Sequence, residues 1–124
     1  MPMTFICPMP PTTNNAYLNI AGRGRVLSSK ARAFKETAII LAIEARKTQD
    51  WHYEAGNRLQ LSLTLYFNKN GKRDLSNRIK LVEDALAEAL GFDDSVIDQL
   101  IISRGQKAKE EFCKISIKQL ENNQ

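Results

Sequence analysis

The chain has very little of what several classes of enzyme require. Its 124 residues include one histidine and two cysteines. A single histidine, His52, gives poor support for imidazole-rich zinc chemistry or for a serine–histidine hydrolase. Cys7 and Cys113 belong to no Cys-x-x-Cys pair and have no metal-ligand spacing. We therefore expect both to be reduced thiols in the core of a cytoplasmic protein.

Long apolar runs are also missing. No run reaches the roughly 18 consecutive apolar residues needed to cross a bilayer, so no membrane partner is expected. The N-terminal stretch MPMTFICPMPP has no basic residue before its apolar residues and is broken by prolines, which is not typical of a signal peptide. The composition, 43% hydrophobic and 26% charged, indicates one globular domain covering residues 1–124.

Hydrophobic periodicity predicts an α+β fold in which two main helices pack on a mixed sheet. The clearest strand runs from Arg58 to Phe67, where leucines alternate with polar residues. One helix is expected at Ser29–Lys47, with Ser28 or Ser29 as its N-cap, and should be well buried because AIILAI (residues 38–43) is apolar nearly all round. The other is expected at Leu75–Leu90, ended by Gly91. Further strands are expected at Thr4–Cys7, Val96–Ser103 and Glu111–Lys118, with a small hairpin around AGRG (residues 21–24) and a frayed tail at residues 119–124.

Positive charge is concentrated in a few loops and turns. The net charge is +4, and basic residues gather in GRGRVLSSKARAFK (residues 22–35), in NKNGKR (residues 68–73) and in RGQKAK (residues 104–109). Exposed loop cations are what a phosphate-contacting surface needs. An ordinary solvated surface explains them equally well until a partner is argued independently.

Carboxylates lie at both ends of the second predicted helix. Asp74 stands at its start, Asp93 and Asp94 stand just past its end, and Lys80 lies between them. Each acid taken alone is explained by helix capping or turn formation, and Asp84 is explained by an i,i+4 pair with Lys80. The alternative is a metal site.

The combination resembles a known family. The stretch RDLSNRIKLVEDALAEALGFDDSVI (residues 73–97) is similar to the signature of the RusA-type Holliday-junction endodeoxyribonucleases. There an Arg-Asp-x-Asp-Asn-x-x-Lys pattern precedes Asp-Ala-Leu, a glycine and an Asp-Asp pair. The stretch PMPPTTNNAY (residues 8–17) resembles the opening of the same family, and the resemblance covers most of the chain.

The resemblance implies a homodimeric, Mg²⁺-dependent nuclease, with Mn²⁺ as a substitute ion, that resolves four-way DNA junctions by paired nicks in recombination and repair. By position it implies catalytic roles for Asp74, Lys80 and Asp94, and a metal site formed by Asp74, Asp93 and Asp94. Ser76 stands where the family commonly has a second aspartate, and a hydroxyl is a weaker ligand for a hard cation. Ser76, Asn77 and Asp84 are candidate accessory residues.

Further cations and polar side chains are candidate DNA contacts, because phosphate binding needs positive charge and exposed bases stack on aromatic rings. For Asn14, Asn15 and Tyr17, the alternative is a structural role in or beside a Pro/Asn turn. The candidates are Asn14, Asn15, Tyr17, Arg23, Arg25, Lys30, Lys69, Lys72 and Arg73.

The predicted helix raises a geometric problem for a metal site in one chain. A continuous helix over residues 75–90 is about 24 Å long. The next residues can bring the chain back by at most about 14 Å. Either the helix is shorter or broken, or Asp74 of one subunit meets Asp93 and Asp94 of another. Leu81 and Ala85 widen the apolar surface of the helix, which indicates a second packing partner.

Two other functions remain open from the sequence. One is a non-catalytic protein that binds branched DNA on the same fold, which Ser76 would favour. The other is a small α+β interaction module with an incidental charge pattern.

Overall fold

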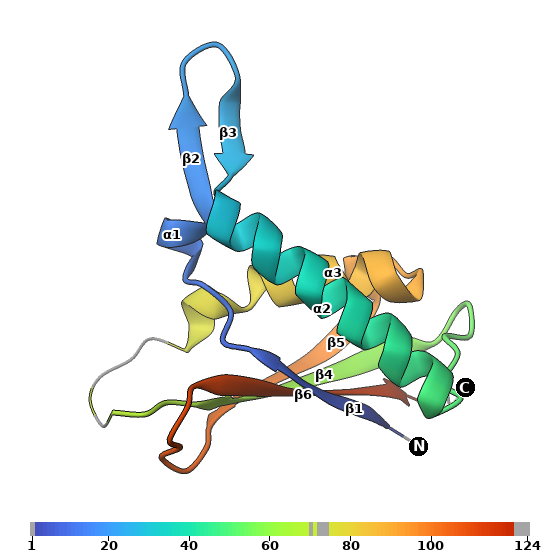
Figure 1. Cartoon of the computed structure of the whole chain (residues 1–124). Helices are drawn as coiled ribbons and strands as arrows, with labels where there is room; N and C mark the ends of the chain where they lie inside the picture. Colours follow the sequence, from blue (N-terminus) through green and yellow to red (C-terminus); the bar gives the residue numbers. More distant parts are fainter. Residues whose placement is uncertain (1, 70, 72–74, 121–124) are drawn as a thin grey trace.

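Two helices cover one face of a four-stranded sheet, and a two-stranded hairpin projects away from this body (Figure 1). The computed structural model describes residues 2–69, 71 and 75–120, and for Asn14 the backbone alone. The predictions for Lys72, Arg73 and Asp74 therefore lie outside the described residues. The elements in chain order are β1 (Met3–Pro8), α1 (Thr13–Ala16), β2 (Tyr17–Ile20), β3 (Gly24–Leu27), α2 (Ser29–Thr48), β4 (Arg58–Tyr66), the 3₁₀ turn η1 (Ser76–Arg78), α3 (Lys80–Leu90), the 3₁₀ turn η2 (Asp94–Val96), β5 (Ile97–Arg104) and β6 (Phe112–Leu120).

The sheet is mixed, as predicted, and its strand order is β1-β6-β4-β5. Strand β6 pairs antiparallel with both β1 and β4, whereas β4 and β5 are parallel. A parallel pair needs a crossover connection, and α3 is the helix of this crossover. The β4–α3–β5 unit therefore carries the whole stretch that resembles a nuclease motif.

Alternation in the central strands builds the core. Leu59, Leu61, Leu63 and Leu65 of β4 are fully buried, and their register partners on β6 include the buried Ile115 and Ile117. Successive side chains of a strand point to opposite faces, so one face of the sheet is apolar and is covered by the helices. The predicted strand and its buried face are confirmed.

Helix α2 is less buried than its apolar run suggested. Its buried residues are Phe34 and four alanines, whereas Ile40 in the middle of AIILAI is 64% exposed. Small side chains let α2 approach the sheet and α3 closely, and the bulky residues lie at the flanks. The expectation of burial all round the helix is wrong. Its limits and its N-cap are confirmed, since Ser28 Oγ accepts a hydrogen bond from Ala31 N at 3.1 Å.

The second predicted helix is shorter than expected. Residues 76–78 form a separate 3₁₀ turn, and the α-helix begins only at Lys80. It ends as predicted, because Gly91 adopts a left-handed conformation (φ 80°) and its N–H donates to Ala87 O at 3.0 Å. Leu81 and Ala85 are buried, and α3, the helix that carries them, packs against α2 of the same chain.

Two smaller expectations are also settled. Gln119 and Leu120 are not part of a frayed tail but the last residues of β6, and Gln119 Nε2 donates to His52 O at 2.8 Å. Cys7 and Cys113 are buried free thiols, as expected, and face each other across β1 and β6. Among the described residues, no helix has the length and apolar composition needed to cross a membrane.

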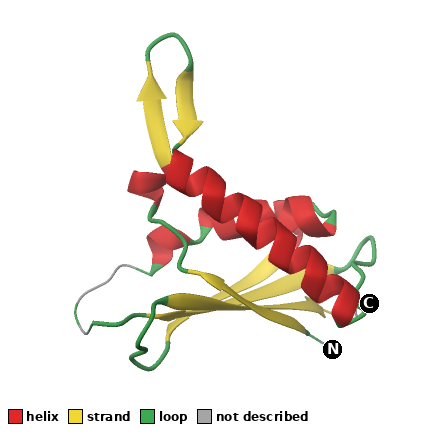
Figure 2. Cartoon of the chain, viewed as in Figure 1, coloured by secondary structure: helices red, strands yellow, loops and turns green. Residues whose placement is uncertain are grey.

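The predicted hairpin is formed by β2 and β3, and Figure 2 shows it extending beyond the start of α2. It pairs with no strand of the four-stranded sheet. The segment before it is fixed at two points, because Thr13 Oγ1 donates to Asn77 O at 2.7 Å and Arg78 Nη1 donates to Pro10 O at 2.8 Å. These bonds attach the base of the hairpin to η1, directly before Lys80.

Candidate active site

Lys80 lies between two carboxylates of its own chain. Its Nζ is 3.2 Å from Asp84 Oδ1 and 3.3 Å from Asp94 Oδ2. The three side chains are half-exposed, with 51%, 31% and 45% of their surface accessible. The structure thus brings together two predicted catalytic residues, Lys80 and Asp94, and the candidate accessory residue Asp84.

Local sequence explains how Asp94 reaches the first turns of α3. Gly91 ends the helix with a left-handed residue, and the chain reverses. Asp93 then caps η2, since its Oδ1 accepts a hydrogen bond from Ser95 N at 2.9 Å. Asp is a preferred residue at such a cap. The cap turns the chain so that the next residue, Asp94, faces Lys80.

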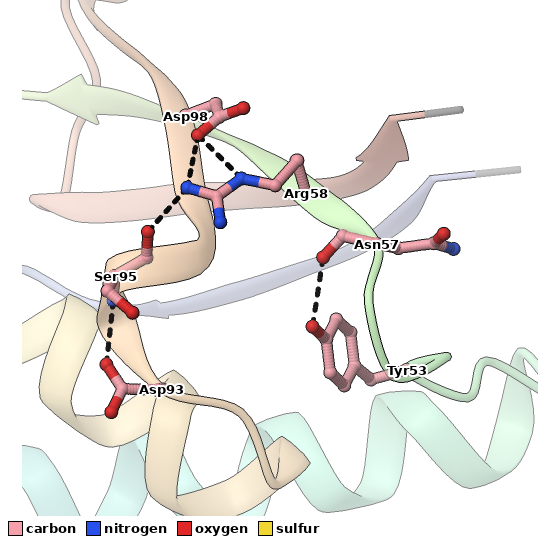
Figure 3. Close-up of polar contacts among 6 residues, drawn as sticks. All are labelled: Tyr53, Asn57, Arg58, Asp93, Ser95 and Asp98. Atoms are coloured by element: carbon pink, nitrogen blue, oxygen red, sulfur yellow. Dashed lines mark hydrogen bonds and ion pairs between the residues drawn. The ribbon is translucent and has the colours of Figure 1, made fainter. Parts of the chain in front are cut away.

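Arg58 fixes the other side of the same turn (Figure 3). Its Nη2 donates to Ser95 O at 2.7 Å, and its Nε donates to Asp98 Oδ1 at 2.8 Å. Bonds between charged groups are stronger than neutral ones and fix orientation when they are paired. Arg58 at the start of β4 therefore holds Ser95 of η2 and Asp98 of β5, the residues one and four positions after Asp94.

The charges of this cluster act on one another. The hydrogen bond to Asp84 raises the pKa of Lys80, and Asp94 acts in the same direction, so the ammonium form persists at neutral pH. Burial raises the pKa of the half-buried Glu83 carboxyl; Lys80 opposes this shift, and the charges of Asp94 and Asp84 add to it. The backbone N–H of Ser95 lowers the pKa of Asp93, as expected for a capping carboxylate.

The donor chemistry of the cluster suits a hard divalent cation. Carboxylate oxygens are the ligands that Mg²⁺ prefers, and Asp84 and Asp94 already share one positive charge, the ammonium of Lys80. Across the part of the chain that is described, no three His, Cys, Asp or Glu residues are grouped to hold a metal. A third carboxylate would have to come from Asp74, which lies outside the described residues.

The candidate accessory residues Ser76 and Asn77 both lie in η1, not on the helix with Lys80. Asn77 Oδ1 is buried and accepts no hydrogen bond from the residues that the structure describes. A buried acceptor of this kind is costly unless a group outside the protein satisfies it. Its position three residues before Lys80 fits an additional polar contact at the site.

Two surface hollows gather candidate DNA contacts. One, of about 310 Å³, is lined by Thr13, Tyr17, Asn19 and Arg25, and the Arg25 guanidinium lies 4.0 Å from the centre of the Tyr17 ring. The other has about the same volume and includes Asn15, Lys30 and Arg78 in its lining. Arg23 lies in the turn of the hairpin, and Lys69 is exposed after β4. For Asn14 the structure describes only the backbone, in α1.

Sequence reasoning missed three polar residues of these sites. Arg58 lies 36 positions before Asp94, and only the parallel pairing of β4 with β5 brings it to η2. Asn19 shares a hollow with Arg25 because of the register of the hairpin. Arg78 did carry a signal, since it lies inside the motif two residues before Lys80.

One of the two reasons for expecting a site shared between subunits has an explanation within one chain, because Leu81 and Ala85 are buried in it and their helix α3 packs against α2. The other reason was the span from Asp74 to Asp94. The helix is shorter than the 16 residues expected and Asp94 lies beside Lys80, but Asp74 lies outside the described residues. Sharing of Asp74 itself stays a prediction.

One comparison with known proteins identifies a family for this chain. The family model of the endodeoxyribonuclease RusA matches residues 8–118, which include the hairpin, the whole β4–α3–β5 unit and most of β6. A search of curated proteins finds no match to the chain. Because the match covers most of the 124 residues, the chain belongs to the RusA family of endodeoxyribonucleases, the Holliday-junction resolvases.

Proposed function

We propose that this enzyme, as a Mg²⁺-dependent homodimer, nicks two opposing strands of a four-way DNA junction during recombination and repair. The observation that carries the proposal is the position of Lys80 Nζ between Asp84 and Asp94, at 3.2 and 3.3 Å. The Lys80 ammonium, held among carboxylates on an exposed surface, can contact a DNA phosphate. The same stretch matches a junction-resolving nuclease family.

Asp74 and Asp94 would hold the metal ion, with Asp84 as a further oxygen donor and Asp93 as the residue that positions Asp94. Bound there, Mg²⁺ neutralises phosphoryl charge and activates water. Lys80 stays protonated because its two carboxylate partners favour the ammonium. It can therefore stabilise the negative charge that develops on the phosphate during hydrolysis.

The basic surface brings DNA to this otherwise acidic position. Arg23 and Arg25 on the hairpin and Lys30 at the start of α2 would contact phosphates, and Tyr17 would stack on an exposed base. The base of the hairpin is hydrogen-bonded to η1 through Thr13 and Asn77. DNA held by the hairpin is thereby placed relative to Lys80.

A nicking assay on a synthetic mobile four-way junction tests the proposal. Wild-type protein should cut two opposing strands in Mg²⁺ and leave them intact in excess EDTA. Asp74→Asn and Asp94→Asn should abolish cutting while junction binding in a gel shift persists. Asp50→Asn is the matched control, because Asp50 is an exposed residue after α2 and should leave cutting unchanged. Equal cutting in EDTA, or by Asp94→Asn, would contradict the proposal.

One observation favours a second candidate, a junction-binding protein that does not cut. Ser76 stands in η1 where the family pattern has an aspartate, and the site then has one negative charge fewer. The variant Ser76→Asp decides between the two. Under the leading proposal it lowers the Mg²⁺ concentration needed for half-maximal nicking. Tight junction binding without nicking by wild type, together with nicking by Ser76→Asp, would instead support the binding protein.

A further inference from the structure

The two edges of the four-stranded sheet differ in how they are protected. On β1, the backbone of Thr4 is occupied by the side chain of Gln49, which accepts from Thr4 N at 3.0 Å and donates to Thr4 O at 2.7 Å. On β5, within the part of the chain that is described, no side chain forms a hydrogen bond to the backbone of residues 98–103. Edge strands of natural proteins are normally covered, charged or broken by proline. The β1 edge is therefore covered by a side chain at Thr4, whereas the described residues provide no such cover for the β5 edge.

The open edge is also apolar at its centre. Residues 99–103 carry no charge and no proline, and Leu100 and Ile101 are 44% and 46% exposed. Leu100 aligns with the buried Leu61 of β4, so it lies on the helix-covered face, whereas Ile101 aligns with Ser62 on the open face. A strand that completes this edge must therefore be apolar at its centre on both faces.

We propose that β5 pairs antiparallel with β5 of a second copy, about a two-fold axis at Ile101, so that the two four-stranded sheets become one. The inference rests on the homodimer of the proposed function and states where its interface lies. A second β5 is apolar at its centre on both faces, and a two-fold axis makes the contact self-complementary. The outward backbone N–H and C=O groups of each β5 then form hydrogen bonds with those of the other.

Charge complementarity fixes the register. With the axis at Ile101, Leu100 lies opposite the partner's Ile102, and Asp98 lies opposite the partner's Arg104. An axis between Leu100 and Ile101 would instead place Asp98 opposite the partner's Ser103. An axis at Leu100 would place it opposite the partner's Ile102. Only the axis at Ile101 matches opposite charges at both ends of the apolar centre.

The two charged residues keep their present contacts in this arrangement. Both hydrogen bonds from Arg58 to Asp98 go to Oδ1, so Oδ2 of Asp98 can accept from the partner's Arg104. The Arg104 guanidinium lies 5.0 Å from the centre of the Phe67 ring, and the ion pair would be added to its contacts. The interface and the candidate active site are linked, because Asp98 and Ser95 are both held by Arg58.

Disulfide formation tests the register directly. Residue 101 is the one position that meets itself, so Ile101→Cys should form a cross-linked dimer under oxidising conditions without DNA or Mg²⁺. The matched control is Gln99→Cys, whose two copies would lie four residues, about 13 Å, apart along the strands. The native Cys7 and Cys113 are buried and should not cross-link. Failure of Ile101→Cys to cross-link, or equally fast cross-linking of Gln99→Cys, would overturn the proposal.

A second pair of variants tests the interface by its stability. Ile101→Lys brings two lysines together and should yield a folded monomer in sedimentation and circular dichroism measurements. Ile6→Lys, at an isoleucine on the other edge strand, β1, that is more exposed than Ile101 (58% against 46%), should remain a dimer. A dimeric Ile101→Lys would overturn the inference and leave the nuclease proposal standing. Cross-linking of Ile101→Cys, together with a wild-type protein that never nicks junctions, would do the reverse.

Discussion

At the scale of single residues, the cluster around Lys80 combines catalytic potential with a cost in stability. The charges of Asp84 and Asp94 raise the pKa of Glu83 there, and within the described residues Lys80 is the cation that contacts these two aspartates. Like charges in a partly buried site disfavour ionisation. A bound divalent cation would relieve this repulsion.

Glu83→Gln should stabilise the protein at neutral pH. Burial raises the pKa of Glu83, so the folded state prefers the protonated carboxyl. The wild-type protein then has its full stability from this group below about pH 4.5, the ordinary value, and loses it as pH rises through the raised pKa. Glu83→Gln should therefore increase Tm at pH 7.5, and the increase should vanish towards pH 4.

Thermal unfolding followed by circular dichroism checks this, with Glu44→Gln as the matched control. Glu44 is exposed on α2. A Tm difference that grows as the pH falls would show that the sign of the argument is wrong.

At the scale of elements, the Tyr66 ring leaves no room for a side chain at Gly105, the residue after β5. A Cβ at this position would lie in the ring of Tyr66, which stacks on Phe112 with 4.3 Å between ring centres. Gly105→Ala should force the ring aside and cost about 1–3 kcal/mol of unfolding free energy. Urea denaturation measures the loss.

The double variant Tyr66→Ala/Gly105→Ala isolates that cause. Removing the ring removes the three atoms nearest to the added methyl group, so the effect of Gly105→Ala should largely disappear in the Tyr66→Ala background. An equal loss in both backgrounds would mean that the backbone, and not the ring, requires glycine.

The hairpin should act through phosphate contacts. Replacing Arg23 and Arg25 by alanine should weaken binding to all junction sequences and lower the slope of log K against log salt by about 1 for each lost contact. The control variant carries Lys47→Ala and Lys118→Ala, and Lys47 lies at the far end of α2, about 30 Å from the hairpin. An unchanged salt slope would show that the hairpin does not contact DNA.

The elements differ in how far the sequence predicted them. Alternation located β4, and Ser28 and Gly91 marked the ends of helices through their capping chemistry. The break before Lys80 was missed because Leu75 and Ile79 continue the apolar spacing of the helix. Periodicity reports which residues face the core, and a 3₁₀ turn can satisfy the same pattern over one turn.

The candidate site was predicted only as far as the motif extends along the chain. Lys80 and Asp94 were expected there, and Asp84 was weighed as a helix pair. The contribution of Arg58 depends on parallel strand pairing, which no local pattern encodes. The role of Asp93 as a cap was an alternative in the sequence, and the structure shows it.

At the scale of the whole molecule, one chain of contacts joins the hairpin proposed to bind DNA, the candidate active site and the edge strand proposed as the dimer interface. The hairpin is bonded to η1, η1 leads into Lys80, Asp94 is presented by a turn that Arg58 holds, and Arg58 also holds Asp98 on the open edge strand. A dimer through β5 would give two related sites, as two opposing nicks require.

The single-turnover rate at which Lys80→Met nicks a four-way junction in Mg²⁺ tests most directly whether the Lys80 cluster is the active site. Loss of a preorganised charge at the reacting phosphate should lower the rate by about 100- to 1,000-fold. Junction affinity should change little, and Lys47→Met should cut at the wild-type rate. A Lys80→Met enzyme that nicks within a few-fold of wild type would contradict the assignment of this cluster as the active site.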